Sequence, residues 1–189
     1  WYSGSGIYRD VKLSVTDKVH VAKYGTTITS PKLEEQKNGA VDTLVKSRIV
    51  NQDDQAHRID AEYEIVDQNG QVVSEKVRSE VQSVLAGQEL NLSHTLHVEK
   101  PTLWDVKTNN PALYTLYTRV YRDSQLVDVQ KERFGYRYLN WTPEGGFFLN
   151  GVATKFHGVS LHHDHGALGA EENYKAEYRR LKQMKDMGV

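Results

Sequence analysis

The fold class is decided by the stretch Val41-Asp42-Thr43-Leu44-Val45-Lys46-Ser47-Arg48-Ile49-Val50. Val41, Val45 and Ile49 fall on one face together with Thr43 and Ser47, while charged side chains take the other face. Apolar and polar residues that alternate with a period of two are typical of a strand with one buried face. This stretch therefore predicts a β protein.

The same alternation recurs along most of the chain. We expect strands at residues 19–28, 41–50, 59–66, 72–77, 90–98, 114–121 and 126–133. Gln68-Asn69-Gly70 predicts a hairpin between two of these strands, because Asn-Gly favours a tight two-residue turn. Arg122-Asp123-Ser124-Gln125 predicts a second hairpin. About seven short strands within residues 17–137 match the size of an immunoglobulin-like sandwich, although the chain lacks the Cys-Trp-Cys pattern of antibody domains.

A different pattern begins after Arg137. A turn-rich joint at residues 140–146 precedes a predicted hairpin of 147–149 with 155–161, which leads into a buried strand. Then one apolar stripe at helical spacing follows: Tyr174, Tyr178, Leu181, Met184 and Met187. Strand, polar loop and amphipathic helix form the opening of a β/α repeat.

A complete (β/α)8 barrel needs ~250 residues, whereas 52 remain from Tyr138 (189 − 138 + 1). The expected fold is therefore mainly β: an immunoglobulin-like sandwich followed by the first β/α unit of a truncated barrel. The chain opens at Trp1 without an initiator methionine, and we interpret it as a piece of a longer protein. We expect the apolar helix face 174–187 to be exposed and to pack on a partner or a symmetry copy.

Composition excludes several classes of partner. The formal net charge is −1 and the 26% of charged residues mix both signs, which argues against a nucleic-acid partner. No apolar run approaches the ~20 residues of a membrane helix. There is no cysteine, so neither disulfides nor Cys-based zinc sites are expected, and the redox compartment stays open.

Four of the eight histidines lie between His157 and His165. His163, Asp164 and His165 are suitable metal ligands by chemistry. A structural site usually needs four placed ligands, so we predict no specific metal site and keep adventitious binding as the alternative. Glu171 and Glu172 are adjacent, and we interpret them as charges favouring a helix start rather than a catalytic pair.

Three segments, in order, resemble glycoside hydrolase family 2, and specifically its β-galactosidases. They are Trp1–Val11, Asn110-Pro111-Ala112-Leu113-Tyr114 with Phe134-Gly135-Tyr136-Arg137, and Phe148-Leu149-Asn150-Gly151 through His157-Gly158-Val159-Ser160-Leu161-His162. The resemblance implies three domains: the tail of a sugar-binding jelly roll at 1–16, the sandwich at 17–137 and the start of a catalytic barrel at 138–189. The His-His-Asp-His-Gly version is similar to large, cell-wall-anchored enzymes of Gram-positive bacteria such as streptococci. This likeness favours an extracellular or surface location, with the cytoplasm as the alternative.

What the resemblance implies is retaining hydrolysis of terminal β-galactosides by two carboxyl groups ~5–5.5 Å apart. In the family both are glutamates on later barrel strands, beyond Val189, so we assign no catalytic residue to this chain. His162 matches a histidine that lines the sugar pocket, and its ring nitrogens suit hydrogen bonds to sugar hydroxyls. Trp1 is a second substrate-binding candidate, with a frayed terminus as the alternative. At His157 the family has arginine, so a packing role is the alternative there.

The predicted role is thus scaffold and one rim of a β-galactosidase active site, inactive without the rest of the enzyme. A β-glucuronidase or β-mannosidase of the same family is an alternative. So is a sandwich module that binds carbohydrate or protein.

We expect no cofactor in this piece, and the resemblance leaves open a divalent or monovalent cation in the longer protein. Trp104 is interpreted as a core or domain-joint residue.

Overall fold

A computed structural model describes residues 6–106, 108, 111–162 and 165–189. The chain divides into two compact units, one of residues Thr16–Ala153 and one that combines Trp1–Val15 with Thr154–Val189. Among the described residues, no helix is long and apolar enough to cross a membrane.

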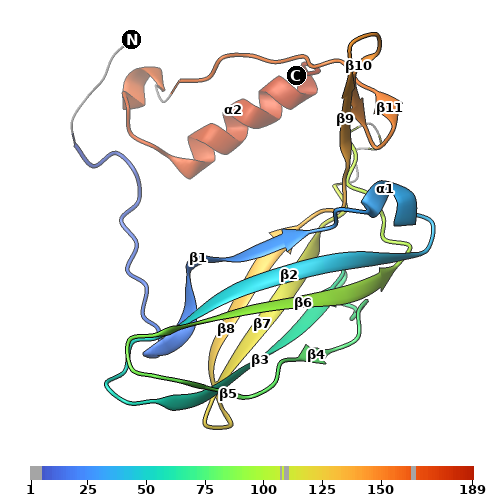
Figure 1. The fold of residues 1–189 in the computed structure, drawn as a ribbon. Coiled ribbons are helices and arrows are strands. Elements are labelled where there is room, and N and C mark those ends of the chain that lie inside the picture. The colour runs from blue at the N-terminus through green and yellow to red at the C-terminus, as the bar shows by residue number, and fades with distance from the viewer. Residues whose placement is uncertain (1–5, 107, 109–110, 163–164) are drawn as a thin grey trace. The chain divides into compact units, whose positions relative to one another are not determined.

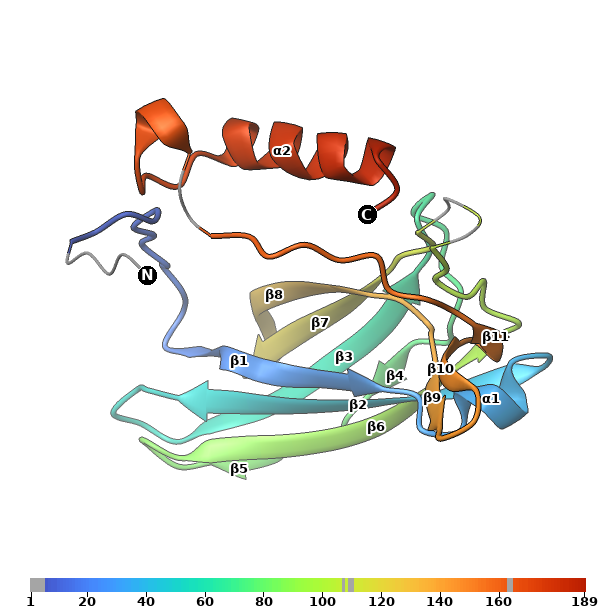
Figure 2. The same ribbon diagram turned by 90° about the horizontal axis from the view of Figure 1, so that it is seen from above.

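The first unit is a sandwich of two antiparallel sheets (Figure 1). One sheet has the order β1-β2-β6, formed by Val19–Thr29, Ala40–Asn51 and Glu89–Glu99. The other has the order β4-β3-β7-β8, formed by Val77–Arg78, His57–Val66, Tyr114–Arg122 and Gln125–Phe134, with β5 (Gln82–Val84) also on β3. A short helix α1 (Leu33–Gln36) links β1 to β2. Figure 2 shows the two sheets as stacked layers.

The core lies between the sheets and follows the predicted alternation. Val41, Val45 and Ile49 of β2 are almost completely buried, as are Tyr63 and Ile65 of β3. At the edge, the Val21 N–H of β1 donates to Asp128 Oδ2 of β8 over 2.9 Å, joining the first strand of one sheet to the last strand of the other. The predicted mainly-β class is confirmed.

The two predicted hairpins have different outcomes. At the second, Asp123 (φ 50°) and Ser124 (φ 70°) take the paired left-handed conformations of a type I′ turn, and β7 pairs with β8 as predicted. At the first, the turn forms, but a single bridge joins Val66 to Val72 and the paired strand β4 begins only at Val77. The predicted strand 72–77 is therefore wrong.

The reason lies in a side chain that replaces a ladder partner. The Ile65 N–H of β3 donates to the Ser74 hydroxyl over 3.0 Å instead of to a backbone carbonyl. Farther along, the Ala61 N–H donates in the same way to the Ser79 hydroxyl. Because the serines satisfy these donors, the segment can run beside β3 without a continuous ladder.

A third, small sheet follows the sandwich strands in the same unit. Its order is β11-β10-β9, formed by Val152–Ala153, Gly146–Leu149 and Leu139–Thr142. Asn150 (φ 52°) and Gly151 (φ 78°) make its turn. The Asn150 Nδ2 donates to the Trp104 carbonyl over 2.9 Å, and its Oδ1 accepts from the Tyr138 N–H over 3.1 Å. One side chain thus ties this sheet to the loop before β7.

Trp104 lies at this junction. A Cβ added to Gly135 would come within 3.1 Å of Trp104 Cβ and 3.2 Å of the Ala112 carbonyl oxygen, closer than ordinary van der Waals contact, so glycine favours the close approach. The Arg137 guanidinium lies 4.9 Å from the centre of the Trp104 ring. These contacts make Trp104 a packing residue at the junction, in agreement with its predicted role.

The second unit contains a 3-10 turn η1 (Gly166–Leu168) and a helix α2 (Tyr174–Asp186). The helix and its apolar stripe are confirmed, and Tyr174, Tyr178 and Leu181 are exposed. The predicted buried strand 155–161 is wrong, because these residues are largely exposed and take no strand conformation. A buried strand needs neighbours to satisfy its backbone on both sides, and the described part of this unit supplies no paired strand. The barrel itself is therefore not shown.

Candidate functional site

The candidate site is the loop of residues 154–173 with the first turns of α2, all within the second unit. Residues 154–162 and His165 of this loop take no regular secondary structure. His157 and His162 expose their side chains, and the roles predicted for them stay predictions. Trp1, His163 and Asp164 lie outside the described residues, and their predicted roles stay predictions.

Among the described histidines of the loop, His165 has a buried side chain. Only 6% of that side chain is exposed, and its Nε2 lies 3.0 Å from Glu177 Oε1 of α2. The two atoms are close enough for an ion pair, although the nitrogen is not aligned for a hydrogen bond. We therefore treat the contact as electrostatic and dependent on the charge of the ring.

Glu177 also pairs with Arg180, three residues farther along the same helix. Arg180 Nη2 lies 2.6 Å from Glu177 Oε1, and Arg180 Nε donates to Oε2 over 3.3 Å. The same Nη2 donates to the backbone carbonyl of His162 over 3.1 Å. We call this chain of contacts, from His165 through Glu177 to Arg180, the relay. The sequence interpretation missed it, although a Glu and an Arg three residues apart on a predicted helix are the expected signal of a facing pair.

The relay fixes the backbone at His162 while leaving the His162 side chain at the surface. Imidazole offers one donor and one acceptor when neutral. An exposed ring on an anchored backbone is suited to orienting a hydroxyl-rich ligand. The geometry is thus compatible with the predicted positioning role of His162.

The start of α2 is built by Asn173. Its Oδ1 accepts from the Lys175 N–H over 3.1 Å and from the Ala176 N–H over 3.2 Å, which satisfies two free donors of the first turn. Glu172 forms an ion pair with Arg9 over 3.0 Å, and its N–H donates to the Tyr8 carbonyl over 3.0 Å. Glu172 therefore contributes to structure, and the sequence interpretation missed Asn173 as the cap.

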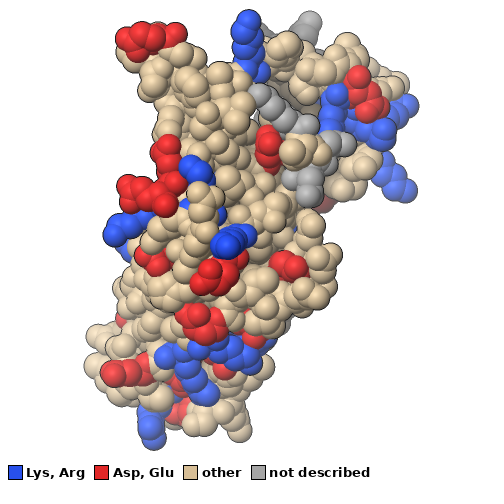
Figure 3. Space-filling view, turned by 90° about the vertical axis from the view of Figure 1, so that its right-hand side faces the viewer, with Lys and Arg blue, Asp and Glu red and all other residues tan. Residues whose placement is uncertain are grey.

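Within the described ranges, no three His, Asp or Glu side chains come together in a way that could hold a metal ion. His165 already faces Glu177, so its imidazole is committed to the loop–helix contact. On the face drawn in Figure 3, acidic and basic side chains are interspersed rather than segregated. This distribution agrees with the near-neutral net charge.

Comparison with known proteins decides the family. The sequence profile of glycosyl hydrolases family 2 matches residues 19–137, which include every strand of the two sandwich sheets. The chain belongs to glycosyl hydrolases family 2. A family 2 protein of Bacteroides cellulosilyticus has a solved structure that superimposes with a TM-score of 0.88 at 31% identity, over 100% of this chain and 25% of that one.

Two curated relatives differ in the sugar that their names give. A β-galactosidase of Bacteroides ovatus is 39% identical over 188 residues, which cover 100% of this chain and 21% of the relative. A β-glucuronidase of Bacteroides fragilis is 28% identical over 184 residues, which cover 97% of this chain and 26% of the relative. The family 2 chain therefore spans about a fifth to a quarter of the length of these relatives.

Proposed function

We propose that this family 2 chain belongs to a retaining β-galactosidase, in which it forms the sandwich scaffold and one rim of the active site. The observation that carries the proposal is the anchored loop: Arg180 holds the His162 carbonyl while the imidazole stays exposed. The 39% identity to the Bacteroides ovatus β-galactosidase supports galactose as the sugar.

In this proposal the chain positions substrate and does not cleave it. Retaining hydrolysis needs a nucleophilic carboxylate and an acid/base carboxyl on opposite sides of the glycosidic bond. We place both on barrel strands that follow Val189 in the longer protein. His162 orients a sugar hydroxyl, the relay of His165, Glu177 and Arg180 holds its backbone, and Trp1 is retained as a second contact to the sugar.

A β-glucuronidase is the second candidate, supported by the Bacteroides fragilis relative. A glucuronide carries a carboxylate at C6 where a galactoside has a hydroxymethyl group, and its C4 hydroxyl has the opposite orientation. A glucuronidase therefore needs a cationic group near the carboxylate. Surface anchoring of the longer protein and a bound cation in it stay predictions from the motif resemblance.

The test compares nitrophenyl β-galactoside and nitrophenyl β-glucuronide as substrates. With the longer protein, we expect the galactoside to give the higher kcat/KM, and the reverse order would favour the glucuronidase. With this chain alone, we expect no turnover of either substrate, and any reproducible kcat would overturn the scaffold role. In the longer protein, His162→Ala should lower kcat/KM by roughly 10- to 100-fold.

A further inference from the structure

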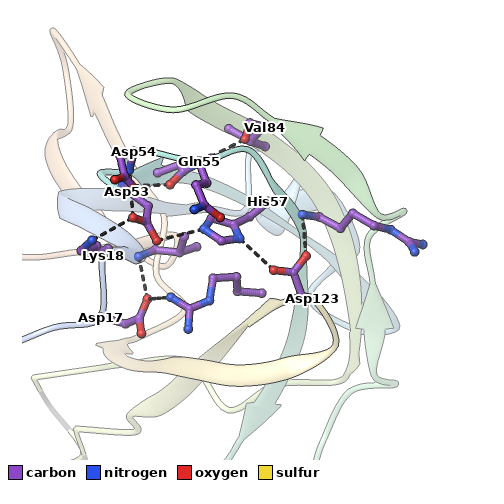
Figure 4. A network of polar contacts seen from close by, with 12 residues as sticks. Asp17, Lys18, Asp53, Asp54, Gln55, His57, Val84 and Asp123 are labelled. Carbon is purple, nitrogen blue, oxygen red and sulfur yellow. Dashed lines mark hydrogen bonds and ion pairs between the residues drawn. The ribbon is translucent and has the colours of Figure 1, made fainter.

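A polar network at one end of the sandwich surrounds His57, the first residue of β3 (Figure 4). Its Nδ1 lies 2.8 Å from Asp123 Oδ2, and its Nε2 lies 3.0 Å from Asp53 Oδ2. Ionised carboxylates only accept hydrogen bonds. Both ring nitrogens must therefore donate, which requires the doubly protonated, positively charged imidazole.

The two carboxylates belong to different segments. Asp123 lies in the β7–β8 turn, and its Oδ1 accepts from the Arg58 N–H over 3.0 Å. Asp53 lies in the β2–β3 loop, and its Oδ1 accepts from Lys18 Nζ, just before β1, over 2.8 Å. His57 thus connects the loop, the turn and the residues that lead into β1.

The other charged groups near His57 are mostly acidic, which favours the protonated imidazole. Asp17 Oδ1 is paired with Arg122 Nη1 over 2.8 Å, and Lys18 is paired with Asp53. Asp54 adds a further carboxylate next to Asp53. If His57 were neutral, one ring nitrogen would present a lone pair to a carboxylate oxygen, and that contact would become repulsive.

We propose that His57, Asp53 and Asp123 form a proton-dependent latch, closed while the imidazole carries both protons and loosened when the ring loses one. The latch fastens the β2–β3 loop to the β7–β8 turn and, through Lys18, holds the start of β1. This role concerns the sandwich itself and does not depend on the proposed glycosidase function.

The pH range of the latch follows from the signs of the shifts. Hydrogen bonds to Asp53 first and Asp123 second raise the pKa of His57, with burial opposing them. The stabilisation is therefore complete below the unfolded pKa of about 6.5 and is lost as pH rises through the higher folded pKa. The pKa of Asp53 is lowered, chiefly by Lys18 and then by His57, and the pKa of Asp123 by the Arg58 N–H and then by His57. At acid pH the latch is lost when these carboxylates take up protons.

The test is an NMR titration of the intact 189-residue chain, with the imidazole nitrogen shifts of each histidine recorded between pH 5 and pH 9. We expect His57 to titrate above its ordinary value with both nitrogens protonated, and Asp123→Asn to lower its pKa. His97 is the site of the control substitution, because its Nδ1 faces the carboxylate of Asp42 and half of its side chain is exposed. His57 titrating at or below its ordinary value of about 6.5, or holding one tautomer at pH 6, would overturn the latch.

Amide exchange gives a second readout. After correction for intrinsic rates, the amides of Asp54 and Arg58 should lose protection between pH 6 and pH 9, while amides of the turn at Asp67–Gly70 should not. In His57→Gln the loss should already be present at pH 6, and in the matched control His97→Gln the wild-type profile should persist. If His57→Gln does not fold, the wild-type titration and Asp123→Asn still decide. Equal profiles in wild type and His57→Gln would refute the proposal.

Discussion

The two units use amphipathic patterns of similar quality with opposite results. In the sandwich, the alternating strands face each other, and Ile49, Tyr63 and Ile65 are fully buried. In the other unit, the stripe of α2 leaves Tyr174 79% and Leu181 52% exposed, and the helix buries none of its residues. The difference shows that a pattern specifies which face seeks burial, while a facing element of matching area supplies the stabilisation.

The largest expected effect is the loss of stability when an apolar core side chain of the sandwich is truncated. The same kind of truncation on α2 is the comparison. Ile49→Ala should lower the free energy of unfolding by about 2–5 kcal/mol, because it leaves a cavity in a packed core. Leu181→Ala should change it by less than about 0.5 kcal/mol, because the side chain is half exposed. Urea unfolding measures both. A comparable loss in the two variants would break the comparison and show that α2 is packed in solution.

The next effect is the difference in stability between two glycine-to-alanine variants, one in each unit. Gly135→Ala should cost about 1–3 kcal/mol, because its Cβ would press on Trp104 and on the Ala112 carbonyl. Gly158→Ala in the other unit is the control, since a Cβ there meets no atom within 4 Å. Thermal unfolding should separate the two variants clearly. If Gly135→Ala is neutral, the Trp104 junction is looser than the structure shows.

A smaller effect concerns the cap of α2. Asn173→Ala should cost the helix about 1 kcal/mol, because the Lys175 and Ala176 N–H groups lose their acceptor. Asn173→Asp should restore the helix, since a carboxylate also accepts from these donors. Exchange of the two amides reports the change. Unaltered protection in Asn173→Ala would mean that other contacts hold the helix start.

The smallest effect is a pH dependence inside the sandwich. His94 packs against the Tyr63 ring, its Nε2 is buried without a hydrogen-bond partner among the described residues, and burial lowers its pKa. The folded state favours the neutral imidazole of His94. The stability of the sandwich is therefore complete above the pKa that His94 has in the unfolded chain, and it falls as pH drops toward the lower pKa of the folded state. His94→Leu should therefore lose less stability than wild type between pH 7 and pH 5 in urea titrations. An unchanged or steeper loss would contradict this environment for His94.

Sequence patterns predicted the sandwich well because each of its strands has a facing sheet. The β7–β8 hairpin was predictable from its turn residues, since Asp123 and Ser124 accept the left-handed conformation that the turn needs. The predicted strand 72–77 failed because serine hydroxyls took the place of ladder carbonyls, a substitution that no alternation pattern reveals.

The candidate site was less predictable. The position of His162 could be read from the motif resemblance, but its anchoring by Arg180 depends on a fold-back of the loop onto the helix. Strand 155–161 was predicted from apolar content, and that content cannot show whether neighbouring strands are present. Tertiary contacts therefore decided both the relay and the missing strand.

The long-range pairing of the sandwich also governs when it can form. The β1-β2-β6 sheet is complete once Glu99 has been synthesised, but β3 pairs with β7 and the Val21–Asp128 bond spans 107 residues. The apolar face of the first sheet therefore has to wait for β7 and β8 before it is covered. Such non-local closure makes folding slow and leaves the intermediate prone to aggregation. The nascent chain therefore exposes this apolar face, and can associate with other chains, until residues 114–134 have been synthesised and have paired.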